Sequence, residues 1–257
     1  MKYLRLRHHG AERLGRIVGD RVELLDGDLF GEHRATGETV LLEGIDWLMP
    51  CVPPKMIIIV NNFHAAVQKS GGSIPEEPLF VVRSPTALNW HRQPIPKPPA
   101  FDGRVFYEGE LGVVVGRVAR NLDETQAAAA IFGYTCVNDV SALELVDKDP
   151  SFAQWTRAKS FDGFGVFGPV IETDALPPDA EVVTTVGGRE RQRYPLSDMI
   201  IPPARLVSMI SRDMTLMPGD VICCGTSVGV LPMKPGSTVE VTVSGVGTLS
   251  NVYAPQD

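Results

Sequence analysis

The sequence has 257 residues, 44% of them hydrophobic and 21% charged, with a formal net charge of −7 at pH 7. An acidic chain without a basic cluster is a poor candidate for binding nucleic acid or an anionic membrane surface. No apolar run approaches the roughly 20 residues of a membrane span, and the first residues lack the apolar core of a signal peptide, so we expect no membrane association and a cytoplasmic location.

Glycine and proline are both frequent, with 25 and 21 residues, which favours many short strands and turns over long helices. We therefore expect a β-rich α+β protein, long enough for one large domain or a small one plus a large one. The four cysteines have no C-x-x-C spacing and are expected to be reduced core residues. They are Cys51, Cys136, Cys223 and Cys224.

Residues 1–52 are predicted to form a small β domain. Apolar and polar residues alternate over 3–7, and Gly19-Asp20 is typical of a hairpin turn. His8 and His9 are expected at a solvated strand end. The proline-containing segment 51–55 breaks the pattern, so we place the domain boundary between residues 52 and 53.

The apolar run 56–60 predicts a buried strand, and a short helix is predicted over 63–69. His64 lies in the first turn of this helix, at the exit of a strand, where both structural and catalytic histidines occur. Gln68 follows at i+4 and can face His64. A further strand is predicted over 79–82.

Glu108 and Glu110 are one residue apart, directly before a β-branched run. On a strand, side chains at i and i+2 point to the same face, so these two carboxylates would lie side by side. Taken alone, the pair is also typical of the solvated face of an edge strand. The alternative is a site for a hard cation such as Mg²⁺, Mn²⁺ or Ca²⁺.

The next elements predicted are a helix over 127–132 and a strand over 134–141. Asp139 is the carboxylate of that strand, in otherwise apolar surroundings. A buried aspartate must be paired, hydrogen-bonded or bound to metal, so Asp139 is a natural third ligand. Lys159 precedes a glycine- and phenylalanine-rich stretch that is predicted to be an ordered loop.

Later in the chain, a hairpin is predicted over 181–194 with its turn at Gly187-Gly188, followed by a helix over 203–212. The C-terminal residues alternate again, which predicts further strands.

Five blocks, taken together and in this order, resemble the fumarylacetoacetate hydrolase superfamily, in particular its 2-hydroxyhepta-2,4-diene-1,7-dioate isomerase and acylpyruvate hydrolase-like members. The blocks are Tyr107-Glu108-Gly109-Glu110-Leu111, Asn138-Asp139-Val140-Ser141-Ala142, Ala158-Lys159-Ser160-Phe161-Asp162 with Gly168-Pro169, Pro218-Gly219-Asp220-Val221-Ile222 with Gly225-Thr226, and Gly245-Val246-Gly247-Thr248-Leu249. The resemblance covers residue 56 to the end.

The resemblance implies a mixed β-sandwich roll over 53–257, preceded by the small β-rich domain, and a homodimer. It also implies a metal-dependent enzyme that hydrolyses, decarboxylates or isomerises a 2-oxo or enol acid, with Mg²⁺ or Mn²⁺ as cofactor and Ca²⁺ as a further option. By position, Glu108, Glu110 and Asp139 correspond to the metal ligands, and His64 and Lys159 to catalytic residues. The residues expected to bind substrate are Gly225, Thr226 and Gln68.

This sequence departs from the family pattern at three positions. Members that hydrolyse C–C bonds have a glutamate three residues after the histidine, where this chain has Val67. The family's arginine and glutamine after the aspartate block are Leu143 and Val146, which makes the pocket less polar. Without an activated water, decarboxylation and isomerisation are easier to support than hydrolysis.

Hydrolysis of a C–C bond in an acylpyruvate or a ring-cleavage product is nevertheless the leading expectation, because such enzymes are numerous in the family. An oxaloacetate-type decarboxylase or an enol–keto isomerase is the alternative. A catalytically silent member that acts in binding or assembly is the alternative of another class. The intact acidic residues and Lys159 favour an enzyme.

Overall fold

A computed structural model describes residues 1–255. Its first 48 residues form an antiparallel meander in the order β4, β3, β2, β1, with β5 on β1. The predicted turn at Gly19-Asp20 is confirmed, since it joins β2 directly to β3. The five strands are β1 (Lys2–His8), β2 (Ala11–Val18), β3 (Arg21–Gly27), β4 (His33–Leu41) and β5 (Asp46–Leu48).

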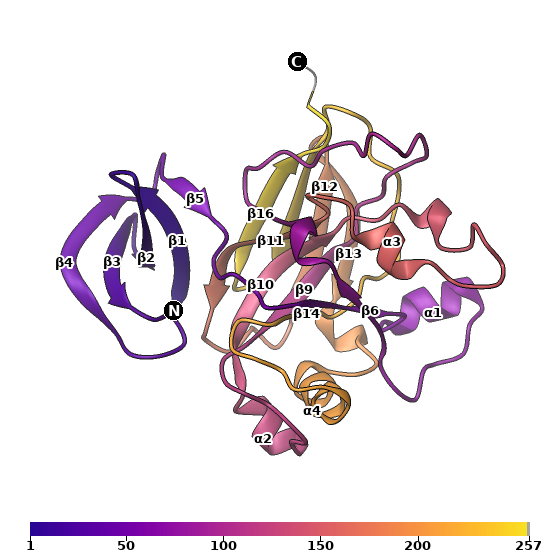
Figure 1. The fold of residues 1–257 in the computed structure, drawn as a ribbon, viewed down its shortest axis with the longest axis horizontal. Coiled ribbons are helices and arrows are strands. Elements are labelled where there is room, and N and C mark those ends of the chain that lie inside the picture. The colour runs from indigo at the N-terminus through magenta and orange to yellow at the C-terminus, as the bar shows by residue number, and fades with distance from the viewer. Residues whose placement is uncertain (256–257) are drawn as a thin grey trace.

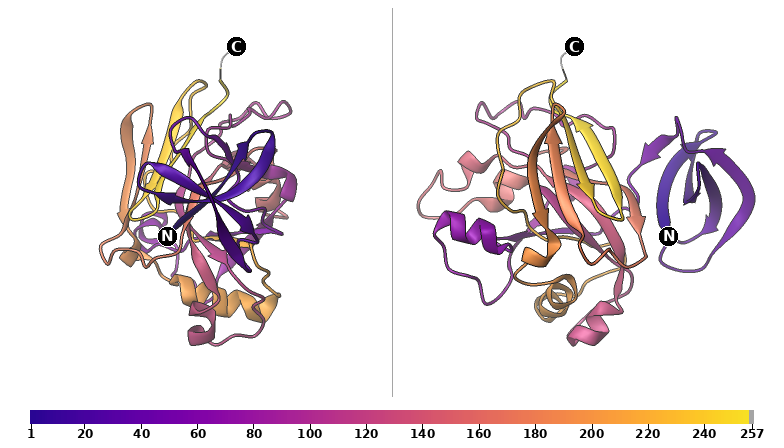
Figure 2. Two further views of the ribbon diagram at one scale, coloured as in Figure 1. Left: turned by 90° about the vertical axis from the view of Figure 1, so that its left-hand side faces the viewer. Right: turned by 180° about the vertical axis from the view of Figure 1, so that it is seen from behind.

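The first strand also joins this meander to the rest of the molecule. Strand β1 pairs with β11 (Gly165–Glu172) through Lys2 opposite Glu172 and Tyr3 opposite Ile171. The N-terminal ammonium adds an ion pair with Glu172 at 2.6 Å. The meander lies at one end of the molecule, as Figures 1 and 2 show, and hydrogen bonds connect its sheet with the larger part.

The larger part of the sheet continues in the order β11, β10, β9, β14, β6, β7, with β8 on β11. It is mixed, because β14 is parallel to β6 and β11 is parallel to β8 while the other pairs are antiparallel. The remaining strands are β6 (Met56–Val60), β7 (Leu79–Arg83), β8 (Leu88–Trp90), β9 (Gly109–Val115), β10 (Ile131–Asp139) and β14 (Val221–Cys223).

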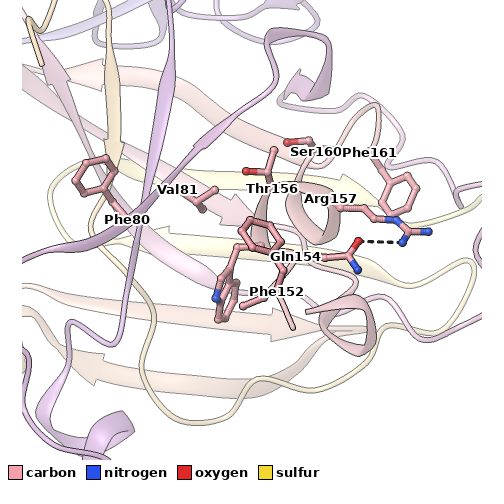
Figure 3. Close-up of a pocket in the computed structure, with 10 residues that line it drawn as sticks. Phe80, Val81, Phe152, Gln154, Thr156, Arg157, Ser160 and Phe161 are labelled. Carbon is pink, nitrogen blue, oxygen red and sulfur yellow. Dashed lines mark hydrogen bonds between the residues drawn. The ribbon is translucent and has the colours of Figure 1, made fainter. Parts of the chain in front are cut away.

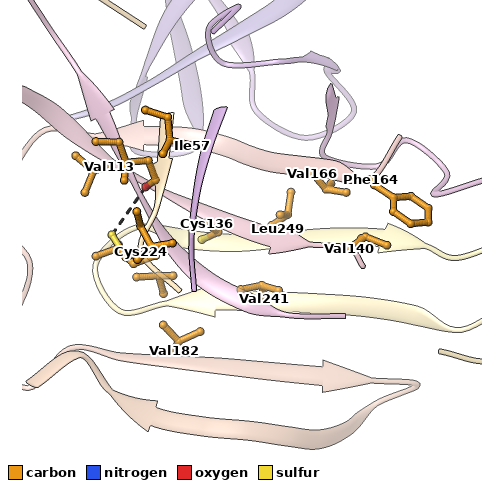
Figure 4. Packing of buried hydrophobic residues seen from close by; sticks show 14 of the residues in the cluster. Ile57, Val113, Cys136, Val140, Phe164, Val166, Val182, Cys224, Val241 and Leu249 are labelled. Atoms are coloured by element: carbon orange, nitrogen blue, oxygen red, sulfur yellow. Dashed lines mark hydrogen bonds between the residues drawn. The ribbon is translucent and has the colours of Figure 1, made fainter. Parts of the chain in front are cut away.

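A second, four-stranded sheet packs against the first. Its order is β13, β12, β15, β16, and the predicted hairpin over 181–194 is confirmed as β12 and β13. Apolar side chains of both sheets meet between them, including Val113 and Cys136 from one sheet and Val182, Val241 and Leu249 from the other (Figure 4). The second sheet consists of β12 (Glu181–Val186), β13 (Arg189–Pro195), β15 (Thr238–Val243) and β16 (Gly247–Val252).

Helices are few and short, as the composition predicts. They are α1 (His64–Ser70), α2 (Glu124–Ala128), α3 (Trp155–Lys159) and α4 (Pro203–Asp213), with 3₁₀ turns at Pro85–Ala87, Leu143–Leu145 and Leu196–Asp198. None in the described part of the chain is long and apolar enough to cross a bilayer. The predicted β-rich α+β class and the sandwich roll with a leading β-rich part are confirmed.

Two predicted elements differ from the structure. The helix expected over 127–132 starts earlier, because Asp123 and Gln126 form a capping box that begins α2 at Glu124. Ile131 already pairs with Val115 as the start of β10, a position that suits a β-branched side chain.

The second difference is the stretch predicted as a loop after Lys159. From Gly165 onward it is β11, a strand whose eight residues are all buried. Gly165 allows this because a Cβ there would lie 2.8 Å from Cδ of Arg83. The glycines of this stretch therefore admit a neighbouring side chain into the roll.

The four cysteines are all free and buried, as expected for core residues. Burial raises the pKa of the Cys51 thiol, and that of Cys136, to about 12. Neither is suited to act as a thiolate nucleophile.

Candidate metal centre and active site

Two neighbouring strands hold the three carboxylates side by side. Glu108 directly precedes β9, Glu110 is the second residue of β9, and Asp139 is the last residue of β10. The pairing of Asn138 with Gly109 and a hydrogen bond from the Asp139 amide to the Glu108 carbonyl, 2.8 Å long, lock the two strands at this point. One oxygen from each carboxylate lies within 4.8 Å of the other two, and all three residues are buried.

Gly109, between the two glutamates, is fixed from the second sheet. Its amide donates to Oε1 of Gln192 at 3.0 Å, and its carbonyl accepts hydrogen bonds from the hydroxyls of Thr226 and Tyr194. A Cβ at this position would overlap Oγ1 of Thr184. The segment can therefore approach the second sheet closely only because residue 109 is glycine.

Lys159 comes from the end of α3 and reaches the carboxylates from outside the two strands. Its Nζ donates to Oε2 of Glu108 at 3.2 Å, to Oδ2 of Asp139 and to Oγ of Ser141 at 2.8 Å. Burial lowers the pKa of Lys159, but the carboxylates of Asp139, Glu108 and Glu110 outweigh it, so the pKa is raised. Lys159 is thus held as an ammonium ion rather than as a base.

Arg83, at the end of β7, is a second buried cation in the site. Its Nη2 donates to Oδ1 of Asp139, and its side chain is 1% exposed. Within the described residues its Nε and Nη1 have no hydrogen-bond partner. Arg83 could not be recognised from the sequence, because an arginine in an ordinary strand gives no local signal of burial; its indirect trace is Gly165, which leaves room for Cδ of Arg83.

Negative charge is poorly compensated at one end of this cluster. Oε2 of Glu110 accepts the amide of Gly225 at 2.8 Å, whereas its buried Oε1 has no partner among the described residues. Burial, followed by the charges of Asp139 and Glu108, raises the pKa of Glu110 well above its usual value; burial is also the main cause of the raised pKa of Glu108.

A divalent cation fits these residues. The donors are carboxylate oxygens, which hard cations such as Mg²⁺ and Mn²⁺ prefer. A cation would also supply the unpartnered Glu110 oxygen with a ligand and offset the repulsion among the three carboxylates.

The loop after β14 contributes the next two expected residues. Gly225 has φ of +94°, and a Cβ there would lie 3.2 Å from the Ile59 carbonyl, so glycine lets the loop pass close to β6 while its amide meets Glu110. Thr226 donates to the Gly109 carbonyl at 3.0 Å and accepts from Nε2 of Gln192 at 2.9 Å. Gly225 and Thr226 therefore both contact the acidic segment directly.

Unlike Gly225 and Thr226, the side chains of His64 and Gln68 form no hydrogen bond with the acidic segment within residues 1–255. His64 is the first residue of α1, as predicted, and both side chains are exposed. Neither side chain forms a hydrogen bond or ion pair with another described residue. Helices α1 and α3 both lie at the end of the molecule away from the N-terminal strands (Figures 1 and 2).

The three departures from the family pattern are all apolar positions. Val67 is the one buried residue of α1, at 3% exposure. Val146 is buried and Leu143 packs against the same hydrophobic cluster. None of the three presents a polar group to the carboxylates.

The chain matches known proteins over nearly its whole length. Residues 55–253 match the family described as fumarylacetoacetate (FAA) hydrolase C-terminal, and residues 1–50 match the family described as Rv2993c-like, N-terminal. A structure of 5-carboxymethyl-2-hydroxymuconate delta-isomerase from Mycobacterium smegmatis is 37% identical, with a TM-score of 0.90 and complete coverage of both chains.

Two further relatives are named for an activity. A structure of 2-hydroxyhepta-2,4-diene-1,7-dioate isomerase from Mycobacterium marinum is 33% identical, with a TM-score of 0.90, and covers 100% of this chain and 99% of that one. Oxaloacetate tautomerase YisK of Bacillus subtilis is 34% identical over 212 residues, which are 77% of this chain and 69% of that protein. On this evidence the chain belongs to the fumarylacetoacetate hydrolase family, whose members include enzymes that act on 2-oxo acids.

Proposed function

We propose that this protein is a divalent-metal-dependent isomerase that interconverts the enol and keto forms of a 2-oxo acid. Glu108, Glu110 and Asp139 would hold Mg²⁺ or Mn²⁺, with Ca²⁺ as a further option. The observation that carries the proposal is the buried set of three carboxylates, one oxygen of which has no partner among residues 1–255. Such a set is costly to bury unless a cation is bound.

A bound cation supplies a Lewis acid that polarises the 2-oxo group and stabilises negative charge on its oxygen. Lys159 adds a fixed positive charge beside the same position, because its ammonium group is held by Glu108 and Asp139. Fixed charges of this kind stabilise an enolate without reorganising during the reaction. Thr226 and Gly225 orient the Glu108-Gly109-Glu110 segment and form one wall beside it.

Isomerisation is favoured over C–C bond hydrolysis by what surrounds His64. Hydrolysis requires an activated water, and general-base catalysis contributes about 10²–10⁴-fold. Among residues 1–255 no carboxylate pairs with His64: the residue at i+3 is the buried Val67 and the residue at i+4 is the neutral Gln68. Enol–keto interconversion needs no water nucleophile, and the relatives described above are named as isomerases and a tautomerase.

Hydrolysis of an acylpyruvate is the second candidate. It is supported by His64 itself, which stands in the first turn of α1 after a strand, where a water-activating histidine can be placed. Decarboxylation would depend on the same stabilisation of negative charge that a cation held by Glu108, Glu110 and Asp139 would supply. A silent binding protein is the least supported alternative, because Lys159 and the three carboxylates are all present and in contact.

The test measures three reactions with Mg²⁺ or Mn²⁺ and after chelation: oxaloacetate tautomerisation, oxaloacetate decarboxylation and acylpyruvate hydrolysis. We expect tautomerisation to be fastest, to stop on chelation and to be lost in Glu110→Ala. If no 2-oxo acid turns over with metal, or if activity survives both chelation and Glu110→Ala, the proposal is wrong. If acylpyruvate hydrolysis is the fastest of the three reactions, the protein is a hydrolase, the second candidate, and not an isomerase.

The homodimer and the cytoplasmic location also remain proposals. Light scattering during size-exclusion chromatography checks the first of these, and a monomer at micromolar concentration would contradict it.

A further inference from the structure

An aromatic cavity lies between β7 and α3. Its volume is about 690 Å³, within the range of roughly 300–1,000 Å³ that ligand pockets usually have. The rings of Phe80, Phe152 and Phe161 stand around it in Figure 3. Ten residues line it: Phe80, Val81, Phe152, Ala153, Gln154, Trp155, Thr156, Arg157, Ser160 and Phe161.

This cavity adjoins the carboxylates through two of its walls. The ring of Trp155 faces the ammonium of Lys159, with 5.8 Å between Nζ and the ring centroid. Oγ of Ser160 accepts the amide of Ser84 at 3.1 Å, next to Arg83. Trp155 therefore lies between the cavity and the ammonium group that binds the carboxylates.

The side chains of Val81 and Arg83 lie on the same face of strand β7. Val81 pairs with Ile58 and Arg83 with Met56, and side chains two residues apart on a strand share a face. Arg83 reaches Asp139 from that face. Val81, which lines the cavity, is thus one step along β7 from a residue that binds the acidic cluster.

The turn before α3 holds an aromatic ring in an unusual position. Phe152 is 73% exposed, although a phenylalanine normally avoids water. Its amide donates to the Asp149 carbonyl at 3.3 Å, and Ser151 donates twice to Oδ1 of Asp149. These bonds order the backbone of the turn that carries Phe152.

Charge decides which kind of group the cavity suits. The carboxylates of Glu108, Glu110 and Asp139 face two buried cations, Lys159 and Arg83. A divalent cation would leave the cluster with one net positive charge, which matches the single carboxylate of a 2-oxo acid head.

A second carboxylate in the cavity would find few partners. Arg157 is the one charged residue among the ten that line it, and its guanidinium is exposed and donates to Oε1 of Gln154 at 3.0 Å. An unpaired charge among aromatic rings would be unfavourable. An uncharged group would instead bury apolar surface against Val81, Phe152 and Phe161.

We propose that this cavity is the subsite for an uncharged aryl or alkyl substituent, so that the substrates are 2-oxo acids with one carboxylate and an apolar tail. This inference rests on the proposed function, because the head must bind at the three carboxylates. It separates this chain from relatives named for oxaloacetate, which has two carboxylates.

Binding of two unreactive analogues tests the subsite without turnover. Oxamate presents only the head, and N-phenyloxamate presents the same head with a phenyl tail. Calorimetry with the Mg²⁺-loaded protein should show N-phenyloxamate binding about tenfold tighter than oxamate, in keeping with burial of part of one ring. Phe152→Ala should remove most of this gain and leave oxamate binding unchanged, and Phe152 is exposed enough for the variant to fold.

Val118→Ala is the matched control, because Val118 is also an exposed apolar residue, at 58%, and does not line the cavity. Catalysis gives a second measurement: kcat/KM for tautomerisation of phenylpyruvate should exceed that for oxaloacetate, and Phe152→Ala should lower only the former.

Three results would overturn the inference. Equal affinity for the two analogues, or an equal loss of both in Phe152→Ala, would show that the tail does not enter the cavity. A preference for oxaloacetate that Arg157→Gln removes would make the cavity an anion subsite. If neither analogue binds to the Mg²⁺-loaded protein, both the subsite and the proposed function are wrong. If oxamate binds and N-phenyloxamate binds no more tightly, only the subsite is wrong.

Discussion

Arg83 and Lys159 bind opposite oxygens of one buried carboxylate. Nη2 of Arg83 donates to Oδ1 of Asp139, and Nζ of Lys159 donates to Oδ2. The two cations come from β7 and α3, elements far apart in the sequence, and they fix the position of the candidate third metal ligand. Asp139 is therefore oriented whether or not a cation is bound.

Replacing Arg83 by methionine should expose the role of its charge. Removing one partner from a buried ion pair costs about 3–5 kcal/mol, so we expect the free energy of unfolding of Arg83→Met to fall by about that amount without metal. The site then has one cation fewer, so Mg²⁺ should raise the midpoint of thermal unfolding more in the variant than in the wild type. Thermal unfolding with and without Mg²⁺ measures both effects.

Arg83→Lys is the matched control, because lysine keeps the charge and loses the planar guanidinium. It should retain the wild-type response to Mg²⁺ while losing some stability. An Arg83→Met protein with wild-type stability and a wild-type Mg²⁺ response would show that Arg83 does not offset the carboxylates.

Glu110→Gln should separate stability from function. Because the pKa of Glu110 is raised, its contribution to stability is present below its ordinary value of 4.5 and is lost as pH rises through the raised value. Without metal at pH 7–8, the glutamine variant should therefore unfold at a higher temperature than the wild type. Metal-dependent activity should fall at least a hundredfold, and Mg²⁺ should no longer shift the unfolding midpoint.

Glu190→Gln is a suitable control for this experiment, since Glu190 is exposed and pairs with Arg193 at the surface. It should change neither activity nor the Mg²⁺ response. A Glu110→Gln protein that is less stable than the wild type in chelator would contradict the claim that the uncompensated carboxylate destabilises the metal-free fold.

Site residues that lie in short sequence motifs could be predicted, whereas a site residue whose partner is distant in the sequence could not. Glu108, Glu110 and Asp139 lie in short motifs, so alternation placed the two glutamates on one face, and the family resemblance of the motifs implied that all three residues meet. Arg83 could not be found in this way, because its partner Asp139 is 56 residues away and the contact depends on the closure of the roll. Long-range pairing of this kind leaves no periodic pattern.

The same holds for secondary structure: elements with a local sequence signal could be predicted, and those that depend on tertiary contacts could not. The hairpin over 181–194 was predictable because its turn is encoded by two adjacent glycines. Strand β11 was not, because Gly165 and Gly168 resemble loop residues locally. Gly165 is required by a tertiary contact, since it makes room for Arg83, and Gly168 has a φ of +123°. A contact between strands that are not neighbours in the sheet thus determines the residue at position 165.

His91 should make stability depend on pH. Its Nδ1 accepts the Ser250 amide at 3.1 Å, and its ring packs on Trp47. Burial, with a smaller effect of Arg92, lowers the pKa of His91 from 6.5 to about 4. The unfolded chain therefore binds a proton near pH 6.5 that the folded protein does not, so the free energy of unfolding should fall as pH drops from 6.5 towards 4.

Urea unfolding at pH 7.5, 6.5 and 5.5 measures this slope. His91→Gln removes the titrating group and should flatten the slope by up to one proton, whereas His9→Gln, at an exposed position, should leave it unchanged. Equal slopes in the wild type and His91→Gln would show that folding does not change the protonation of His91.

The last prediction concerns the missing partner of His64. Val67 occupies the position at which hydrolytic relatives are expected to have glutamate, but its side chain is buried under α1. Val67→Glu would bury an unpaired carboxylate, so we expect a loss of about 3 kcal/mol in the free energy of unfolding and no gain in hydrolysis. Gln68→Glu instead places the charge on the exposed face, four residues after His64, where it can favour the protonated imidazole.

If His64 can activate water, Gln68→Glu should raise acylpyruvate hydrolysis at least tenfold relative to tautomerisation, a smaller gain than the roughly 10²–10⁴-fold of a well-placed general base. Gln68→Met matches the size of the side chain without its charge and should leave the ratio unchanged. A stable Val67→Glu protein with increased hydrolysis would instead mean that position 67 faces the site when substrate is bound, and that a single substitution distinguishes this chain from the hydrolases.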